Sequence, residues 1–470
     1  MFSARLLLSA VLVATASASL LRVVPGDLEA RGVPGSHQYA KRGLVRRASA
    51  TNAAEMAKVS GMAQECQQYG DQAVTDLVQK KAFPTTGQLA TLLPNDKEAK
   101  SIWSDIQKSG IVPSDVKVKQ QQGSDHMGTS QGNYNVQEDP DCWWTVSQCK
   151  EPKHKGFPAD LFQCPEPDTW GLTFDDGPNC SHNAFYDYLQ KNKLRATLFY
   201  IGTNVVNWPY QAQRGITDGH DICVHTWSHH YMTTFNSEQA FAELYYTAKA
   251  IKMITGVTPS CWRPPYGDVD DRIRAIAAGL GLRTITWAED TDDWNMEPAG
   301  KQPTASIDAN YQKIIDKADS ESPIVLTHEI NQYTMEEFQK MYPKVEKAYK
   351  HVVPLTACQN VTNPYPEDIT YSNFADFTSG KIEAKGLPSV NSIKTDPTAK
   401  FNAVPLSKMK NGYANPGAGG SSGGSGAKSN NENTSSGGSG QKSGAAGVSA
   451  TGMGALGMLG GAVAVGLIAM

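Results

Sequence analysis

Between residues 160 and 358, short apolar runs typical of strands alternate with amphipathic segments typical of helices. The strand candidates are 169–174, 196–201, 221–225, 283–287 and 324–328. The helical candidates are 183–191, 210–218, 237–255, 270–278 and 308–318. This alternation predicts an α/β unit with a mostly parallel sheet, either open or closed into a barrel. Both architectures place chemistry at the carboxyl ends of strands.

The first strand candidate ends in Asp175-Asp176-Gly177-Pro178. Gly and Pro interrupt a strand, so a turn at this point projects both carboxylates from the edge of the sheet. The alternative interpretation is an ordinary turn in which an Asp side chain bonds its own backbone.

Two histidines, His225 and His229, follow the third strand candidate. At this spacing they share one face if the segment is helical. Two imidazoles and one carboxylate supply three ligands for a divalent metal and leave positions for water. The alternative is a solvated or capping pair, and His220 and His230 are neighbouring alternative ligands.

Three further motifs follow strand-like runs. In Arg263-Pro264-Pro265-Tyr266-Gly267, the permanently charged Arg can hold a carboxylate ionised, with a surface ion pair as the alternative. The other two motifs are Asp290-Thr291-Asp292-Asp293-Trp294 and Leu326-Thr327-His328. Taken singly, Trp294 fits a core as well as a pocket wall, and His328 fits a structural histidine.

The amino terminus has the pattern of a secretory signal. Arg5 precedes an apolar run over 6–14, and the small residues 16–18 follow, which predicts a signal peptide over 1–18 rather than a short buried helix. Dibasic pairs at 41–42 and 46–47 indicate a propeptide over 19–47, with ordinary solvated charges as the alternative.

The carboxyl terminus has the pattern of a lipid-anchor signal. Residues 416–447 are rich in Gly and Ser and predict a flexible linker. Small residues from Ser443 and the apolar tail 448–470 predict a GPI anchor attached at Ser443, with removal of the tail. A single membrane span is the alternative. These signals predict a secreted protein anchored at the outer face of the plasma membrane and in the cell wall.

Two extensions flank the α/β unit, which we place at 159–360. Residues 48–158 predict a partly helical amino-terminal extension, and 361–415 predict a stalk or loosely packed extension. Within the first extension, Trp143-Trp144 lies between Cys142 and Cys149 and suggests a small glycan-binding element.

Cysteines and sequons agree with secretion. The eight cysteines predict disulfides whose pairing the sequence leaves open, and the absence of a CxxC pair argues against a cysteine zinc site. Asn179, Asn360 and Asn433 are candidate glycosylation sites. Asn179 lies beside the first motif, which argues against its modification.

The five motifs, in this order over about 200 residues, resemble the polysaccharide deacetylase (NodB homology) family, the family-four carbohydrate esterases. With the two terminal signals, the chain is most similar to the fungal chitin deacetylases of that family. The resemblance implies a distorted (β/α) barrel, a divalent metal such as Zn²⁺ or Co²⁺, and hydrolysis of N-acetyl groups from N-acetylglucosamine polymers.

The resemblance also implies residue roles. Asp175 matches the catalytic base and Arg263 the residue that orients it, while Asp176, His225 and His229 match the metal ligands. His328 matches the catalytic acid. The Tyr266 backbone N–H matches an oxyanion donor, and Trp294 and Leu326 match the acetyl pocket.

The fourth motif departs from the family pattern. Ala288-Glu289 precede it and an insertion at 297–303 follows it, which leaves the carboxylate partner of His328 open. Asp290 is our first choice and Asp293 the second.

The net charge of −4 gives no electrostatic footprint for nucleic acid. The same motifs serve esterases of acetylated xylan and deacetylases of peptidoglycan, and the anchor signal argues against peptidoglycan. A non-catalytic glycan-binding wall protein is the alternative from a different class, although it has no need for the His, Asp and Arg set.

Overall fold

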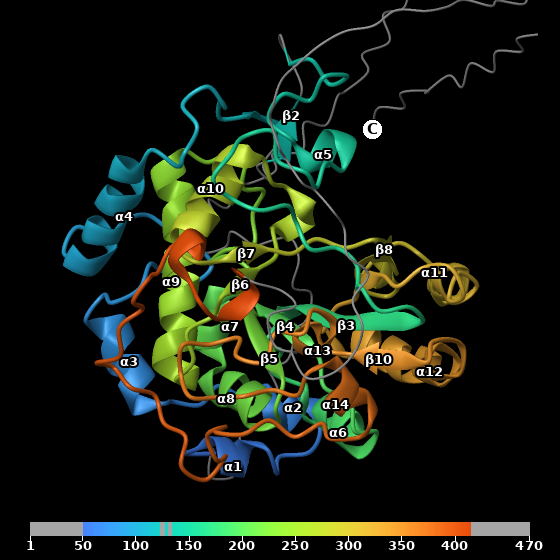
Figure 1. Ribbon diagram of the computed structural model, residues 1–470. Helices are drawn as coiled ribbons and strands as arrows, with labels where there is room; N and C mark the ends of the chain where they lie inside the picture. Colours follow the sequence, from blue (N-terminus) through green and yellow to red (C-terminus); the bar gives the residue numbers. More distant parts are fainter. Residues whose placement is uncertain (1–49, 123–126, 130–133, 415–470) are drawn as a thin grey trace, which may run out of the picture. The chain divides into compact units, whose positions relative to one another are not determined.

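The computed structural model describes residues 50–122, 127–129 and 134–414 (Figure 1). The predicted signal peptide, propeptide, linker and anchor tail therefore lie outside the described residues, as do Asn433 and Ser443. Within the described part, we find no helix with the length and apolar character needed to cross a bilayer.

One parallel sheet forms the centre of the α/β unit. Its strands are β3 (Thr169–Gly177), β4 (Thr197–Tyr200), β5 (Asp221–Val224), β6 (Cys261–Trp262), β7 (Arg283–Thr284), β8 (Glu289–Asp290), β9 (Ile324–Leu326) and β10 (His351–Val353). The strand order is β7-β6-β5-β4-β3-β9-β8, and β10 pairs with the first three residues of β3. Every pairing in this sheet is parallel.

The sheet curls strongly. β7 and β8 stand at opposite ends of the strand order, yet Glu289 comes only five positions after Thr284 in the chain. Five residue steps span at most about 18 Å, whereas the edges of a flat sheet with six inter-strand spacings would lie about 29 Å apart. The two edge strands must therefore approach each other. The predicted distorted barrel is confirmed.

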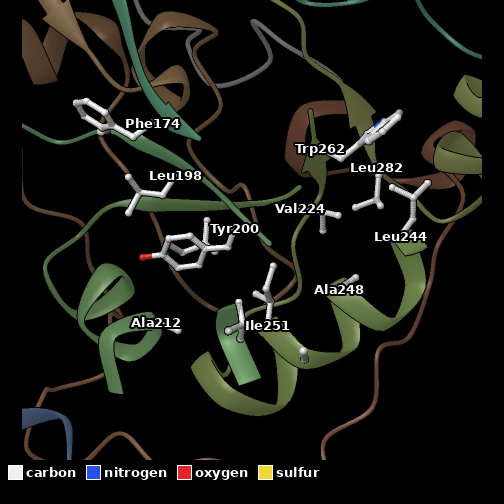
Figure 2. Packing of buried hydrophobic residues seen from close by; sticks show 14 of the residues in the cluster. Phe174, Leu198, Tyr200, Ala212, Val224, Leu244, Ala248, Ile251, Trp262 and Leu282 are labelled. Carbon is white, nitrogen blue, oxygen red and sulfur yellow. The ribbon is translucent and has the colours of Figure 1, made fainter. Parts of the chain in front are cut away.

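Helices cover the sheet. They are α6 (Asn183–Lys191), α7 (Gly202–Asn207), α8 (Pro209–Thr217), α9 (Ser237–Thr255), α10 (Asp271–Gly279), α11 (Thr304–Ile315), α12 (Gln332–Ala348) and α13 (Leu355–Cys358). The longest, α9, begins at a capping box between Asn236 and Gln239 and ends at Gly256 in the left-handed conformation. Figure 2 shows Leu244, Ala248 and Ile251 of this helix in the same buried cluster as side chains of β4 and β5.

The amino-terminal extension packs on this unit. Its elements are α1 (Ala53–Met56), α2 (Met62–Glu65), α3 (Gln72–Gln79), α4 (Lys97–Ser109), the hairpin of β1 (Gln120–Gln122) and β2 (Met127–Thr129), and α5 (Trp144–Ser147). Trp103 of α4 packs on Phe241 of α9, with ring centroids 5.1 Å apart. Trp143 is fully buried and Trp144 packs against Trp287. Trp143 is therefore inaccessible to a glycan, whereas Trp144 is only partly buried, and a glycan-binding element at Trp144 stays a prediction.

The segment after residue 360 is also packed, and the prediction of a stalk or loose extension is wrong for 361–414. It contains α14 (Phe374–Thr378) and two short 3-10 turns, η3 (Leu406–Lys408) and η4 (Gly412–Ala414). Tyr365 and Tyr413 are buried, and their hydroxyls donate to the two oxygens of Asp221 at 2.9 and 2.5 Å. Tyrosine supplies apolar area together with a partner for a buried carboxylate, so a Pro- and Tyr-rich stretch can close a core.

Four disulfides use all eight cysteines: Cys66–Cys180, Cys142–Cys149, Cys164–Cys358 and Cys223–Cys261. The last of these joins β5 to β6, directly before the motifs that contain His225 and Arg263. The predicted use of the cysteines in disulfides is confirmed.

Candidate active site

The first motif lies at the end of β3. The pairing of β3 with β4 shifts register between Asp175 and Gly177, and Asp176 has a φ of 72°. In a regular strand, neighbouring side chains point to opposite faces. The bulge interrupts that alternation, so two adjacent carboxylates reach the same end of the sheet. Both side chains are buried.

The two predicted histidine ligands converge on Asp176. The distances from Asp176 Oδ1 to His225 Nε2 and His229 Nε2 are 3.3 and 3.0 Å. His225 Nδ1 lies 2.8 Å from the backbone oxygen of Arg263, which fixes the orientation of its ring. A second hydrogen bond of this kind is the usual means of orienting a ligating histidine.

The helical interpretation of this segment is wrong. Thr226 and His229 have φ values of 63° and 55°, and the His229 N–H donates to Thr226 Oγ1 at 3.1 Å. The two rings meet because of this turn and not because of helical spacing. His230 Nδ1 lies 2.8 Å from the Ser228 backbone oxygen, and His220 Nδ1 accepts the Ala196 N–H, so neither alternative ligand joins the group.

The residues present fit a divalent metal. Ligand atoms of Asp176, His225 and His229 all lie within 4.8 Å of one another. Asp176 Oδ1 is buried and, apart from its close contacts with the two imidazoles, accepts no hydrogen bond from any described residue. A buried carboxylate oxygen without a hydrogen-bond donor is costly unless a cation compensates it. Burial opposes its ionisation, but the imidazoles of His229 and His225 hold the pKa of Asp176 well below its usual range. One oxygen and two nitrogen donors suit Zn²⁺ and similar ions.

Arg263 follows β6 and orients Asp175. Its Nη1 donates to Asp175 Oδ1 at 2.7 Å and to Thr173 Oγ1 at 2.8 Å. The guanidinium is fully buried and lies over the Phe199 ring. The other carboxylate oxygen, Asp175 Oδ2, lies 3.8 Å from His225 Nε2. Asp175 is thus held through one oxygen, with the second directed toward the ligand group.

His328 reaches the site through backbone pairing with β3. The Asp175 N–H donates to the Thr327 oxygen and the Glu329 N–H donates to the Asp175 oxygen, each at 3.0 Å. These two bonds place residue 328 beside residue 175.

The structure corrects the expected partner of His328. Asp293 Oδ1 lies 2.6 Å from His328 Nδ1, whereas Asp290 accepts the backbone N–H of Asp292 at 2.8 Å. Burial opposes protonation of His328, but Asp293 outweighs it and raises the pKa of the imidazole to about 10. Burial raises the pKa of Asp290 to about 7. The carboxylate partner of His328 is therefore Asp293, our second choice, and the prediction of Asp290 is wrong.

The remaining predicted site residues lie around these groups. Tyr266 lies in a 3-10 turn, η1 (Pro265–Gly267), is 40% exposed, and stacks on Tyr231 with centroids 4.2 Å apart. Leu326 is buried at the end of β9. Trp294 lies in a second turn, η2 (Asp293–Asn295), and is 49% exposed, so it does not belong to the core.

Sequence reasoning missed Glu243, which holds the histidine turn. This fully buried residue of α9 accepts the N–H groups of Trp227 and Ser228 through Oε2, each at 2.9 Å. Its Oε1 accepts the Ala90 N–H and the Ser228 hydroxyl at 2.7 Å each. A carboxylate in the middle of a predominantly apolar helix was the available signal.

The two candidate glycosylation sites within the described residues have engaged side chains. Asn179 Nδ2 donates to the Ile330 oxygen at 2.7 Å, and Asn360 Oδ1 accepts the Phe374 N–H at 2.9 Å. The contact at Asn179 uses the nitrogen to which a glycan would be attached. It agrees with the argument against modification at this position.

Comparisons with known proteins identify the family of this chain. Residues 162–285 match the family described as polysaccharide deacetylase. Chitin deacetylase 2 of Cryptococcus neoformans var. grubii is 44% identical over 384 residues, covering 78% of this chain and 82% of that protein. The chitin deacetylase of Amylomyces rouxii is also 44% identical, covering 68% and 76%. This chain belongs to the polysaccharide deacetylase family.

Among solved structures, the chitin deacetylase of Colletotrichum lindemuthianum is 26% identical with a TM-score of 0.40. The match covers 43% of this chain and 92% of that one.

Proposed function

We propose that this protein hydrolyses the N-acetyl groups of chitin, releasing acetate and leaving glucosamine units, as in chitosan. The observation that carries the proposal is the ligand group of Asp176, His225 and His229 beside the Arg263-held Asp175. The two relatives that are 44% identical over most of their length bear the name chitin deacetylase.

Asp176, His225 and His229 would hold a divalent cation, for which we propose Zn²⁺ or Co²⁺. Such a cation lowers the pKa of water to about 7 and polarises a carbonyl. Asp175 accepts the proton of the attacking water. Arg263 keeps one carboxylate oxygen of Asp175 engaged, so the other is presented to that water.

His328 is the acid in this scheme. Because Asp293 raises its pKa to about 10, the imidazole is protonated at neutral pH and can donate to the leaving amine nitrogen. The Tyr266 backbone N–H donates to the oxyanion that forms on the acetyl carbonyl. Trp294 and Leu326 line the space for the acetyl methyl group.

The proposed location is the cell surface. Four disulfides suit an oxidising, extracellular compartment. We propose secretion after removal of 1–18, GPI attachment at Ser443 and retention at the plasma membrane and cell wall. Of the three sequons, Asn360 and Asn433 are the proposed glycosylation sites in preference to Asn179.

Acetate release from a soluble chitin oligomer tests the function. We expect a chelator to abolish release and added Zn²⁺ or Co²⁺ to restore it. Asp175→Asn should keep the metal and lose turnover, whereas His225→Ala should lose both. Near-normal turnover by Asp175→Asn would refute the proposed base. If acetate were released faster from acetylxylan than from the chitin oligomer, acetylxylan would be the better-supported substrate and the proposal of chitin would be wrong.

A further inference from the structure

Asp268 joins three segments around the proposed site. It lies two residues after Tyr266 and is fully buried. Its Oδ1 accepts hydrogen bonds from Trp143 Nε1 at 2.8 Å and from the Thr145 hydroxyl at 2.6 Å. Its Oδ2 accepts the Thr233 N–H and the Thr233 hydroxyl, each at 2.8 Å.

The donors come from distant parts of the sequence. Trp143 and Thr145 belong to the loop closed by the Cys142–Cys149 disulfide, which we call the disulfide loop. Thr233 follows the metal-ligand turn, four residues after His229. Asp268 belongs to the loop that begins at Arg263 and contains Tyr266. One carboxylate therefore connects the extension with two motifs of the proposed active site.

The Tyr266 loop needs such support because its backbone is strained. Tyr266 has a φ of 58° and Gly267 a φ of 71°, so two successive residues are left-handed. A residue other than glycine keeps this conformation only where its surroundings enforce it. The enforced conformation also determines where the Tyr266 N–H points.

The disulfide loop covers the same turn with a ring. A Cβ added to Gly267 would lie 2.3 Å from ring atoms of Trp144, so the indole occupies the space directly over that glycine. The backbone N–H of Trp144 donates to the Val269 backbone oxygen at 3.0 Å. The turn is thus held by the Trp144 ring and backbone and by the Trp143 and Thr145 side chains.

We propose that the disulfide loop, acting through Asp268, is a positioning element that holds the Tyr266 backbone N–H in place for the oxyanion. This proposal rests on the proposed function. It makes Asp268, Trp143 and Thr145 positioning residues, since none of them contacts the reacting atoms. It also means that part of the amino-terminal extension, which contains none of the five motifs, contributes to catalysis.

The donors around Asp268 make Asp268→Asn an informative substitution. The indole N–H of Trp143 and the backbone N–H of Thr233 can only donate, and they face different oxygens of Asp268. In Asp268→Asn, either orientation of the amide turns its NH₂ toward one of these donors. The isosteric variant must therefore lose one of the two connections while keeping its volume.

The test compares acetate release by full-length variants at saturating and limiting chitin oligomer. For Asp268→Asn we expect kcat to fall about tenfold, with KM and bound metal unchanged, because oxyanion donors act mainly in the transition state. A loss confined to thermal stability, with wild-type kcat at a temperature where the variant is folded, would overturn the proposal. A loss of bound metal would also overturn it, since it would locate the effect in the Thr233 segment.

A matched pair of Thr→Val variants covers the case in which Asp268→Asn does not fold. Thr145→Val removes a hydroxyl that donates to Asp268, and Thr378→Val removes one in α14, outside the disulfide loop, that donates to the Phe374 backbone oxygen. We expect kcat to fall several-fold in Thr145→Val and to stay unchanged in Thr378→Val. Equal kcat values in the two variants would refute the proposal. Asp175→Asn, assayed alongside, tests the proposed function separately.

Discussion

Asp293 binds both the ring and the backbone of His328. Its Oδ1 lies 2.6 Å from His328 Nδ1, and its Oδ2 accepts the His328 backbone N–H at 2.9 Å. Two contacts from one fully buried carboxylate fix the orientation of the imidazole. Because Nδ1 is engaged, Nε2 is the nitrogen that presents a proton to substrate.

Asp293→Asn should reduce kcat at least about 100-fold, since an amide neither stabilises the imidazolium nor fixes its tautomer. Acetate release from a soluble chitin oligomer measures this effect. The matched variant is Asp290→Asn, three positions before Asp293 in the same motif; the Asp290 side chain accepts the Asp292 N–H and has no hydrogen bond to His328. We expect it to stay within about threefold of wild type, and the reverse ranking would restore Asp290 as the partner.

The same contact predicts a pH dependence of stability. The folded-state pKa of His328, about 10, lies above the ordinary histidine value of about 6.5. A raised pKa contributes stability that is fully present below pH 6.5 and is lost as the pH rises through 10. For chelator-treated protein, we expect the free energy of unfolding lost in Asp293→Asn to be large at pH 6 and to shrink by pH 10.5. Urea titrations at both values measure it, and a pH-independent difference would contradict the assignment.

The long regular elements could be predicted from the sequence because their end signals are local. The ranges 183–191 and 237–255 match α6 and α9, and the latter has its capping residues in the adjacent sequence. The two-residue strands β6 and β8 are too short for any periodicity. The helix α12 contains Pro343, which is a signal against a helix.

Within the site, the residue types could also be predicted from the sequence, but their geometry could not. The residue types of the metal group were recognisable, but their convergence depends on a left-handed residue at His229 that no local pattern indicates. The choice between Asp290 and Asp293 depends on the 3-10 turn η2, which brings the later carboxylate to His328. Both the conformation of His229 and the turn η2 depend on how the flanking segments pack. That packing involves residues far apart in the sequence, so a local pattern does not reveal it.

Glu243→Gln should weaken metal binding about tenfold. The carboxylate accepts four hydrogen bonds, three of them from backbone N–H groups that can only donate. Whichever way the Gln amide is oriented, its NH₂ faces such a donor, so the turn between His225 and His229 loosens. Titration of the chelated protein with Zn²⁺ measures the change.

A surface residue of the same helix provides the control for that experiment. Glu238→Gln changes the charge in the first turn of α9 and should leave Zn²⁺ affinity unchanged. Equal affinity in Glu243→Gln and wild type would show that the turn keeps its shape without this carboxylate.

Metal removal should lower the thermal stability of the wild-type protein. A ligand that binds only the folded state stabilises it by about 2.7 kcal/mol at 100 times its Kd. The buried Asp176 Oδ1 is the atom that gains most, since its only close polar neighbours among the described residues are the two imidazoles that would bind the same cation. Asp176→Ala should abolish the shift in Tm on adding Zn²⁺, because it removes the carboxylate ligand. His230→Ala should retain the full shift, since the His230 ring is oriented by Ser228 and not toward Asp176. A Zn²⁺-dependent rise in Tm that survives Asp176→Ala would place the cation elsewhere in the protein.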